Sequence, residues 1–430
     1  MNNKRVTFWI IAIIGIFLFV CIAGCASTPT PISSPDTDES EKEETLPEAP
    51  NTIKIGYAIS LTGPYSTGAK VTQVPNYQLW AHEVNEKGGL YLSKYDQRVP
   101  IELIEYDDTS NIETAIRLIE RLIDEDKVDL LLPPWGTAMN FAVAPIINQY
   151  QFPVIAPTAT DMDWYKIGPN YPYVFSMLNQ PDVTMKAFME FLKTQREAGK
   201  IGNKVAVIFV GDKFGIEHAG IMTPLLAVYD FELVYYESYP LGITDLSSVL
   251  REIMQRKPDV FIALSYPGDT FMITEQSSTL GFNPAVFYTA VATAFPSFRN
   301  NFGAERVEGI MGHGAWNPKV PFTGAANYFD RHVAVTGQEP DRWASAHAYA
   351  SLQILEQAVE EVGSVDRAKI REVIATGEFD TIIGKVTFDQ FGLNTQFPGL
   401  VGQWQNGEFE VVCPSEDATA DPIIPKPSWQ

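Results

Sequence analysis

Cysteine is scarce in this sequence. Three occur among 430 residues, and only Cys413 lies beyond the first fifty. A disulfide within the main part of the chain is therefore excluded, although an exported protein would permit one.

Basic residues are also few, 31 against 53 acidic ones, which gives a net charge of −22. Beyond residue 52 the Lys and Arg residues form no cluster larger than the pair Arg256-Lys257. A nucleic-acid partner needs a basic surface, so the sequence argues against one. The negative sign itself indicates solubility and identifies no ligand.

Motifs of catalysis and metal binding are missing. No Gly-x-Ser-x-Gly segment occurs, and His82-Glu83 lacks the second histidine of a zinc-binding His-Glu-x-x-His helix. The spacing of the other histidines does not suggest metal ligands, so we expect no metal, no cofactor and no enzyme activity; they are His218, His313, His332 and His347. Asp107-Asp108 is either a carboxylate pair or a loop cap, and a cap is favoured because successive strand residues face opposite ways.

One long apolar run is present, from Val6 to Ile22, after Lys4 and Arg5. It ends at Ala23-Gly24-Cys25, which is typical of an export signal over residues 1–24. The segment Ile22 to Cys25 resembles the lipobox of bacterial and archaeal lipoproteins, which implies a lipid on Cys25. An uncleaved membrane anchor is the alternative, and either one places the remainder outside the cytoplasm.

Residues 25–51 are rich in Ser, Thr, Pro, Asp and Glu and hold few apolar residues. Such a segment cannot bury enough apolar surface to order itself, so we expect a flexible tether. About 380 residues follow, and the chain is 45% hydrophobic, which suits two lobes rather than one core.

Short apolar strands alternate with helices along the rest of the chain. The first series has strands at 53–59, 101–106, 128–132 and 153–156, with helices at 68–86, 113–124 and 137–150. A second series has strands at 205–210, 232–237, 260–264, 285–288 and 309–311, with helices at 182–195, up to 227, 246–255 and 270–280. Helices at 322–335 and 343–362 and strand-like segments at 379–388 and 399–409 complete it. This alternation predicts an α/β fold with two doubly wound lobes and parallel sheets.

Several segments of the chain resemble those of type I periplasmic binding proteins, in the branched-chain amino-acid-binding family. They occur in family order between Thr52 and about Cys413: Leu61-Thr62-Gly63-Pro64, Val84 to Leu90, Tyr106-Asp107-Asp108, Pro153 to Thr160, and Phe388 to Gly392. Each segment is weak alone, but five with matching spacing make a specific signal.

The resemblance implies two lobes joined by three hinge crossings, near 175–181, 312–318 and 377–383, with the ligand in the cleft between the lobes. The expected first lobe is 52–177 plus 315–378, the second is 178–314 plus 379–413, and 414–430 is a tail. The implied role is delivery of a small ligand to an ABC permease by a monomeric protein. A sensor that acts on a signalling partner is the alternative, and a hydrolase is a third reading.

Three threonines are candidates for binding a ligand carboxylate. Thr137 follows Trp135-Gly136 at the end of a predicted strand and opens a helix, where free N–H groups suit an anion. The resemblance implies that Thr137 contacts the carboxylate and that Thr158 and Thr160 supply the second contact. The alternative is that these threonines only cap helices.

Aromatic residues gather in the same predicted loops. They are Tyr65, Trp135, Trp164 and Tyr165 in the first lobe and Phe214 and Tyr266 in the second. Rings with a few polar groups are the usual walls of a small-molecule pocket, although packing at a lobe edge explains any single ring equally well.

The loop from Thr289 to Pro296 departs from the family pattern. Amino-acid-binding members carry an acidic residue there, whereas this chain offers Thr293 and no carboxylate. An unpaired buried ammonium is costly, so an amine-free carboxylate, such as an aromatic acid, is favoured unless Asp163, Asp212 or Asp269 pairs with an amine.

Overall fold

The computed structural model describes residues 47–395 and 399–429. The predicted signal peptide, Cys25 and nearly all of the predicted tether lie outside the described residues. Among the helices that are described, none combines the length and apolar character needed to span a bilayer.

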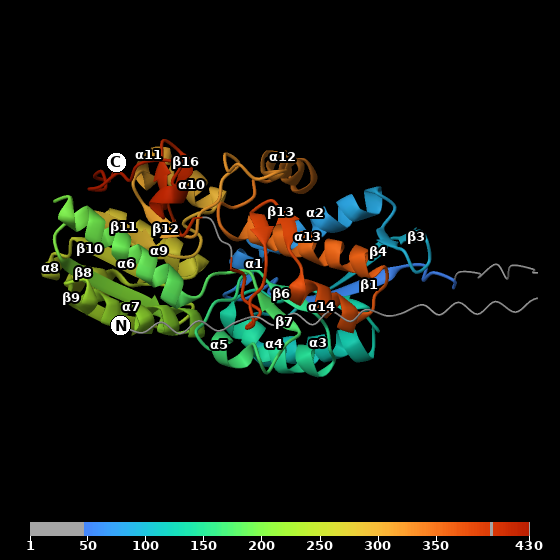
Figure 1. The fold of residues 1–430 in the computed structure, drawn as a ribbon. Coiled ribbons are helices and arrows are strands. Elements are labelled where there is room, and N and C mark those ends of the chain that lie inside the picture. Colours follow the sequence, from blue (N-terminus) through green and yellow to red (C-terminus); the bar gives the residue numbers. More distant parts are fainter. Residues whose placement is uncertain (1–46, 396–398, 430) are drawn as a thin grey trace, which may run out of the picture. The chain divides into compact units, whose positions relative to one another are not determined.

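The first lobe is built on a three-stranded parallel sheet in the order β4-β1-β5. Ile53 pairs with Ile101, and Ile55 pairs with Leu130. The helices around this sheet bury their apolar residues against it, and Figure 1 shows α2, α3 and α13 around β1 and β4. The elements of this lobe are β1 (Ile53–Ile59), α1 (Ser66–Thr72), α2 (Val74–Glu86), β4 (Ile101–Asp107), α3 (Ile112–Asp124), β5 (Leu130–Leu131), α4 (Thr137–Gln149), α12 (Ala325–Thr336), α13 (Ala344–Val362) and α14 (Arg367–Thr376).

Local details of the first lobe differ from the sequence prediction. The single helix predicted over 68–86 is two helices that meet at Gln73, because Pro75 has no N–H to donate to the carbonyl of Val71. The predicted strand at 153–156 does not join the main sheet. It is β6 (Val154–Ala156), which pairs in parallel with β7 (Val174–Ser176). Short elements that the sequence pattern did not predict are β2 (Leu90–Leu92), β3 (Gln97–Val99) and α5 (Trp164–Ile167).

The second lobe holds a seven-stranded sheet in the order β16-β15-β12-β11-β10-β8-β9. Strands β8 to β12 are parallel, but β15 and β16 run antiparallel. Asn406 and Gly407 both have positive φ and form the tight turn that makes β15 and β16 a hairpin. The elements are α6 (Pro181–Glu197), β8 (Lys204–Val210), α7 (Lys213–Val228), β9 (Glu232–Tyr239), α8 (Ser247–Arg256), β10 (Val260–Leu264), α9 (Pro267–Leu280), β11 (Val286–Thr289), α10 (Pro296–Phe302), α11 (Ala304–Val307), β12 (Met311–His313), β15 (Val401–Gln405) and β16 (Glu408–Cys413).

The α/β fold with two parallel-stranded lobes is thus confirmed, with the antiparallel hairpin as a correction to purely parallel sheets. The predicted third crossing, near 377–383, also differs from the structure. Strands β13 (Phe379–Thr381) and β14 (Gly384–Val386) form a hairpin that contacts α13, and Asn394 still donates to the carbonyl of Met177 at 3.1 Å. The chain therefore joins the second sheet only after Asn394.

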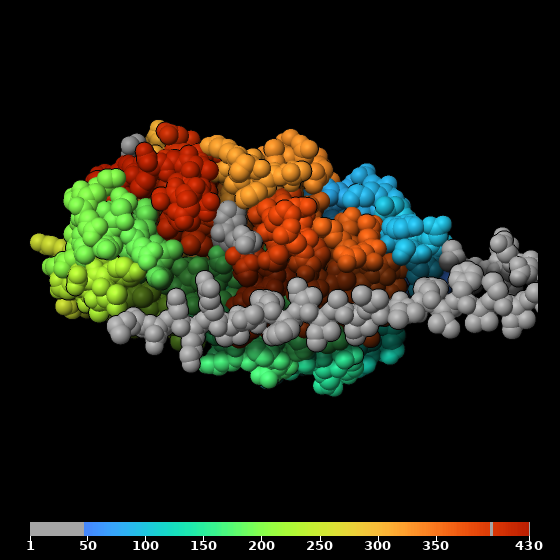
Figure 2. Space-filling model, viewed as in Figure 1, coloured from blue at the N-terminus to red at the C-terminus, as the bar shows by residue number. Residues whose placement is uncertain are grey.

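The final residues, predicted as a tail, pack on the second lobe. Trp429 Nε1 donates to the carbonyl of Phe282 at 2.7 Å, and Gln403 exchanges two hydrogen bonds with the backbone of Ile423. Lys426 is buried, and its ammonium lies 3.6 Å from the centre of the Trp429 ring. In Figure 2 the red surface of the last part of the chain lies beside the green surface of α6.

Asp107 and Asp108 cap loops, as the sequence favoured. One oxygen of Asp107 accepts from the N–H groups of Leu61, Thr62 and Thr109, and Asp108 accepts from Ser60 and Ser110. These bonds fix the loops after β1 and β4, which lead into the region where the candidate residues lie.

Candidate functional site

The loop before α4 is shaped by a glycine. Gly136 has φ 91° and ψ 155° and precedes Thr137, the first residue of the helix. The Trp135 ring packs closely on α1 at Gly68, since a Cβ on Gly68 would come within 2.2 Å of the ring. Trp135 Nε1 donates to Thr72 Oγ1 at 3.1 Å. The N–H groups of the first turn of α4 are left without a partner inside the helix, as at any helix start.

The three candidate threonines lie together and are buried. Thr137 Oγ1 accepts from the N–H of Thr160 and donates to the carbonyl of Thr160, both at 3.3 Å, and Thr158 Oγ1 accepts from the N–H of Gly136 at 3.1 Å. The hydroxyl of Thr160 donates to the carbonyl of Asn179 at 2.8 Å. Residue 136 is the N-cap of α4 and no side chain caps this helix, so Thr137 does not cap α4 in this structure.

Gln73 ties this loop cluster together, and the sequence analysis did not identify it. Gln73 is fully buried at the junction of α1 and α2, and its Oε1 accepts from the Thr158 hydroxyl at 2.6 Å. Its Nε2 donates to the carbonyl of Pro133 at 3.1 Å. Pro75, which cannot donate a helical hydrogen bond, is the sequence signal that could have drawn attention to this position.

Four candidate rings, two from each lobe, form one cluster. Tyr65 lies 5.8 Å from Trp135 and 5.4 Å from Tyr266, and Trp135 lies 5.5 Å from Tyr266, measured between ring centres. Phe214 stacks on Tyr266 at 5.3 Å. The cluster therefore joins the loops after β1 and β5 to the loops after β8 and β10.

A carboxylate lies within this ring cluster. Tyr65 and Tyr266 both donate their hydroxyl to Asp212 Oδ2, at 3.1 and 2.9 Å. Asp212 is the N-cap residue of α7, yet its side chain does not cap the helix. Burial, followed by the charge of Asp212, raises the pKa of Tyr65 and of Tyr266 above the ordinary value for tyrosine.

The other two carboxylates considered for a ligand amine already have partners. Asp269 accepts from the N–H of Tyr266 at 2.9 Å and from the Tyr239 hydroxyl at 2.8 Å. Asp163 accepts from Lys166 and Lys213. Of the three, Asp212 is the carboxylate that contacts the rings.

Three predicted residues lie apart from the ring cluster. Trp164 packs on Phe141 with 5.1 Å between ring centres. Tyr165 donates to Asp182 at 3.3 Å. Thr293 is fully buried, and its hydroxyl donates to the carbonyl of Thr289 at 2.6 Å.

Buried imidazoles adjoin Phe214, and the sequence spacing gave no sign of this. His218 lies 4.4 Å from Phe214 and 5.8 Å from His313 between ring centres, and His313 lies 5.7 Å from Trp343. Burial lowers the pKa of His218 to about 4, and it lowers that of His313 to about 3 with help from the neighbouring imidazoles. His347, whose Nδ1 lies 2.8 Å from the carbonyl of Trp343, has its pKa lowered by burial to about 4. These imidazoles are neutral at pH 7.

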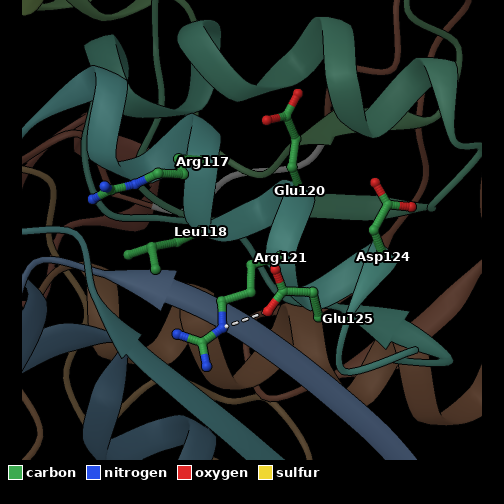
Figure 3. Close-up of a pocket in the computed structure, with 6 residues that line it drawn as sticks. All are labelled: Arg117, Leu118, Glu120, Arg121, Asp124 and Glu125. Carbon is green, nitrogen blue, oxygen red and sulfur yellow. Dashed lines mark ion pairs between the residues drawn. The ribbon is translucent and has the colours of Figure 1, made fainter.

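A surface depression on α3 offers no comparable chemistry. Figure 3 shows that charged side chains of one helix line it, and that Arg121 pairs with Glu125. The loops with the threonines and rings contribute nothing to it.

Comparison with known proteins gives one family. The model of a periplasmic binding protein family matches residues 52–408. A curated relative is the Leu/Ile/Val-binding protein homolog 7 of Brucella abortus, which is 21% identical over 87% of this chain and 94% of its own length. Another is an amino acid binding protein of Pseudomonas aeruginosa, 22% identical over 81% of this chain and 90% of its own.

Solved structures share the fold. One is the branched-chain amino acid transporter substrate-binding protein LivJ of Streptococcus pneumoniae in complex with isoleucine, with a TM-score of 0.71, 21% identity, and coverage of 84% of this chain and 99% of that one. Another is a solute-binding protein from R. palustris in complex with benzoate, with a TM-score of 0.70, 18% identity, and coverage of 87% and 98%.

Proposed function

This chain belongs to the periplasmic binding protein family. We propose that it is the solute-binding component of an ABC importer and that it binds a small organic carboxylate. The family is one of binding proteins and not of enzymes, which confirms the expectation drawn from the missing catalytic motifs. Membership also implies a location outside the cytoplasm.

The observation that carries the ligand proposal is the geometry at the start of α4. Thr137 directs its hydroxyl to the loop of Thr160, and the first-turn N–H groups of α4 lie beside it. The N–H groups and the helix dipole favour a carboxylate over a neutral or cationic group. The Thr137 hydroxyl, which donates to the carbonyl of Thr160 at 3.3 Å, would turn to the carboxylate when the ligand binds.

The rings favour an apolar body on the same ligand. Tyr65, Trp135, Phe214 and Tyr266 supply apolar faces beside the threonine loops, as in most small-molecule sites. The relatives with solved ligands bind isoleucine in one case and benzoate in another. An amine-free acid, such as an aromatic one, suits the loop of Thr293, which has no carboxylate, whereas an amino acid would need Asp212 for its ammonium.

In the mechanism that we propose, the ligand carboxylate docks first on Thr137 and Thr160. Phe214 and Tyr266 of the second lobe then close over the apolar body, so that binding energy shifts a hinge equilibrium toward the closed form. The permease would recognise that closed form.

The remaining parts of the proposal concern membrane attachment. Residues 1–24 would direct export, the lipid on Cys25 would hold the protein at the membrane, and residues 25–51 would serve as a tether. We propose that the protein acts as a monomer, and a sensor role with a signalling partner is the second candidate.

The first test is thermal stabilisation of the full-length chain in detergent by matched pairs of ligands. Each pair holds one amino acid and its amine-free analogue, such as phenylalanine with 3-phenylpropionate and leucine with 4-methylpentanoate. Benzoate and its amide, benzamide, are added. A ligand that selects the folded state raises the melting temperature. Stabilisation by an amide but by no carboxylate would contradict the carboxylate site, and turnover of any ligand would contradict a binding role.

A further inference from the structure

A lysine of the second lobe reaches carboxylates of the first. Lys213, the first residue of α7, places Nζ 3.0 Å from Asp161 Oδ2 and 2.9 Å from Asp163 Oδ2. The two aspartates follow β6 in the first lobe. The contact therefore joins the lobes, as does the Phe141 ring of α4, whose centre lies 4.7 Å from the same ammonium.

The environment of this ion pair is more buried than that of a surface pair, so removing one partner leaves a buried charge without compensation. The Asp161 side chain is 0% exposed and that of Lys213 is 28% exposed. Burial raises the pKa of Asp161, against the lowering effect of the Asp163 N–H and of Lys213. Burial alone would lower the pKa of Lys213, yet the two aspartates raise it. The charge of Asp161 thus depends on the lysine when the lobes are in contact.

A third carboxylate, that of Glu217, adds to the negative charge that Lys213 neutralises. Glu217, one turn along α7 from Lys213, has an oxygen within 4.8 Å of oxygens of Asp161 and Asp163. Burial, and then the charge of Asp161, raises the pKa of Glu217. Without Lys213, carboxylates from both lobes would face one another and repel.

The ion cluster and the proposed ligand contacts lie on the same short segments. Asp161 directly follows Thr160, and Lys213 lies between Asp212 and Phe214. Asp161 is held beside the first crossing, because its N–H donates to Gln180 Oε1 at 2.8 Å and its Oδ1 accepts from the N–H of Asp163 at 2.7 Å. A movement that brings Phe214 over the ligand also brings Lys213 to Asp161.

We propose that Lys213 is a positioning residue that latches the two lobes together, and that it stabilises the closed, ligand-bound form through Asp161 and Asp163 without contacting the ligand. Only one part of this proposal, the effect of the latch on ligand affinity, rests on the proposed function. Its effect on the distance between the lobes can be measured without any ligand.

The first measurement is the distance between spin labels on the two lobes of the full-length chain in detergent. The labels are attached to unnatural ketone-bearing amino acids that replace exposed Glu120 in the first lobe and exposed Val228 in the second. Ketone chemistry leaves the native cysteines unmodified. We expect Lys213→Met to shift the distribution to longer distances and Glu217→Gln to shift it to shorter ones, because the first removes the attraction and the second removes repulsion. Lys213→Arg keeps the charge and should restore the original distribution.

The matched control is Lys166→Met. Lys166 pairs with the same Asp163 at 2.8 Å, but both residues lie in the first lobe, and the lysine side chain is 79% exposed. This control loses the same charge and should leave the distance unchanged. Raising the salt concentration from about 0.05 M to about 1 M should screen the ion pair and lengthen the distance between the labels in the unaltered chain. This measurement is the test if Lys213→Met does not fold.

The second measurement is the dissociation rate of a bound ligand. The probes are benzoate, phenylalanine and leucine, and the rate is measured for each probe that stabilises the chain. We expect Lys213→Met to raise this rate about tenfold, with little change in the association rate, because the latch acts after docking. Equal distances and equal rates in Lys213→Met and Lys166→Met would overturn the latch. Binding of none of the probes, together with the predicted distance shifts, would instead count against the proposed function and leave the latch supported.

Discussion

The two lobes contribute to the candidate site in different ways. The first-lobe loop holds Thr158 by a hydrogen bond to Gln73 of the same lobe, and it holds Thr160 by a hydrogen bond to the carbonyl of Asn179 at the first crossing. The second-lobe loop of Asp212 and Lys213 makes its polar contacts largely with the first lobe, through Tyr65, Asp161 and Asp163. The comparison indicates that the first lobe is preorganised for docking and that the second lobe supplies closure.

The largest expected effect concerns the imidazoles where the two regions meet. The pKa values of His218 and His347 fall to about 4 and that of His313 to about 3, against 6.5 for an ordinary histidine. The unfolded chain then binds more protons, so this stability is complete above about pH 6.5 and is lost as the pH falls toward 4. Each histidine should cost about 2 kcal/mol between pH 7 and pH 5.

Urea unfolding at several pH values checks the contribution of His218. Carboxylates also titrate in this range, so the informative quantity is the difference between the unaltered chain and His218→Asn. The variant should lose stability less steeply with acid. Parallel curves for the two chains would mean that His218 is not held neutral in the folded protein.

Next in size is the preorganisation of the first lobe. Gln73→Leu removes the acceptor of the Thr158 hydroxyl and a donor to the carbonyl of Pro133, both buried. We expect the free energy of unfolding to fall by about 2 to 3 kcal/mol, because buried polar groups lose their partners. A change below about 0.5 kcal/mol, measured by urea unfolding, would show that this loop is not held by Gln73.

Ligand docking on the first lobe is tested by Thr137→Val, which keeps the side-chain shape and removes the hydroxyl. Affinity for the stabilising carboxylate should fall by about 1 to 3 kcal/mol if Thr137 bonds it. Calorimetry is the measurement, and Thr137→Ser, which keeps the hydroxyl, is the control. Unchanged affinity in the valine variant would remove Thr137 from the site.

The smallest expected effect is on ligand affinity, and it tests whether Asp212 of the second lobe contacts a ligand amine. Asp212→Asn keeps an oxygen that can accept from Tyr65 and Tyr266 but removes the charge. Affinity for an amino acid should fall by about 1 kcal/mol, while its amine-free analogue should be unaffected or bind better. Equal changes for both members of a ligand pair would mean that Asp212 does not contact the amine.

The sequence predicted those parts of the fold that depend on local patterns. Apolar strands such as Val260–Leu264 and helices such as Ile112–Asp124 were recognised because their burial follows a regular period. The hairpin of β13 and β14 was placed on the wrong lobe, since its apolar residues suit either core. Thr293, chosen from its loop alone, satisfies its hydroxyl within its own turn.

The sequence by itself determined the two-lobed α/β fold and the chemistry on offer, namely threonines at a helix start, rings in neighbouring loops and no carboxylate between Thr289 and Pro296. Only the tertiary structure decided which charges meet. Asp212 contacts the rings, Asp269 caps α9, and Lys213 bridges to Asp161, although the residues that meet lie up to 147 positions apart in the chain. Such pairings depend on how two folded lobes come together, and no local period or propensity encodes that contact.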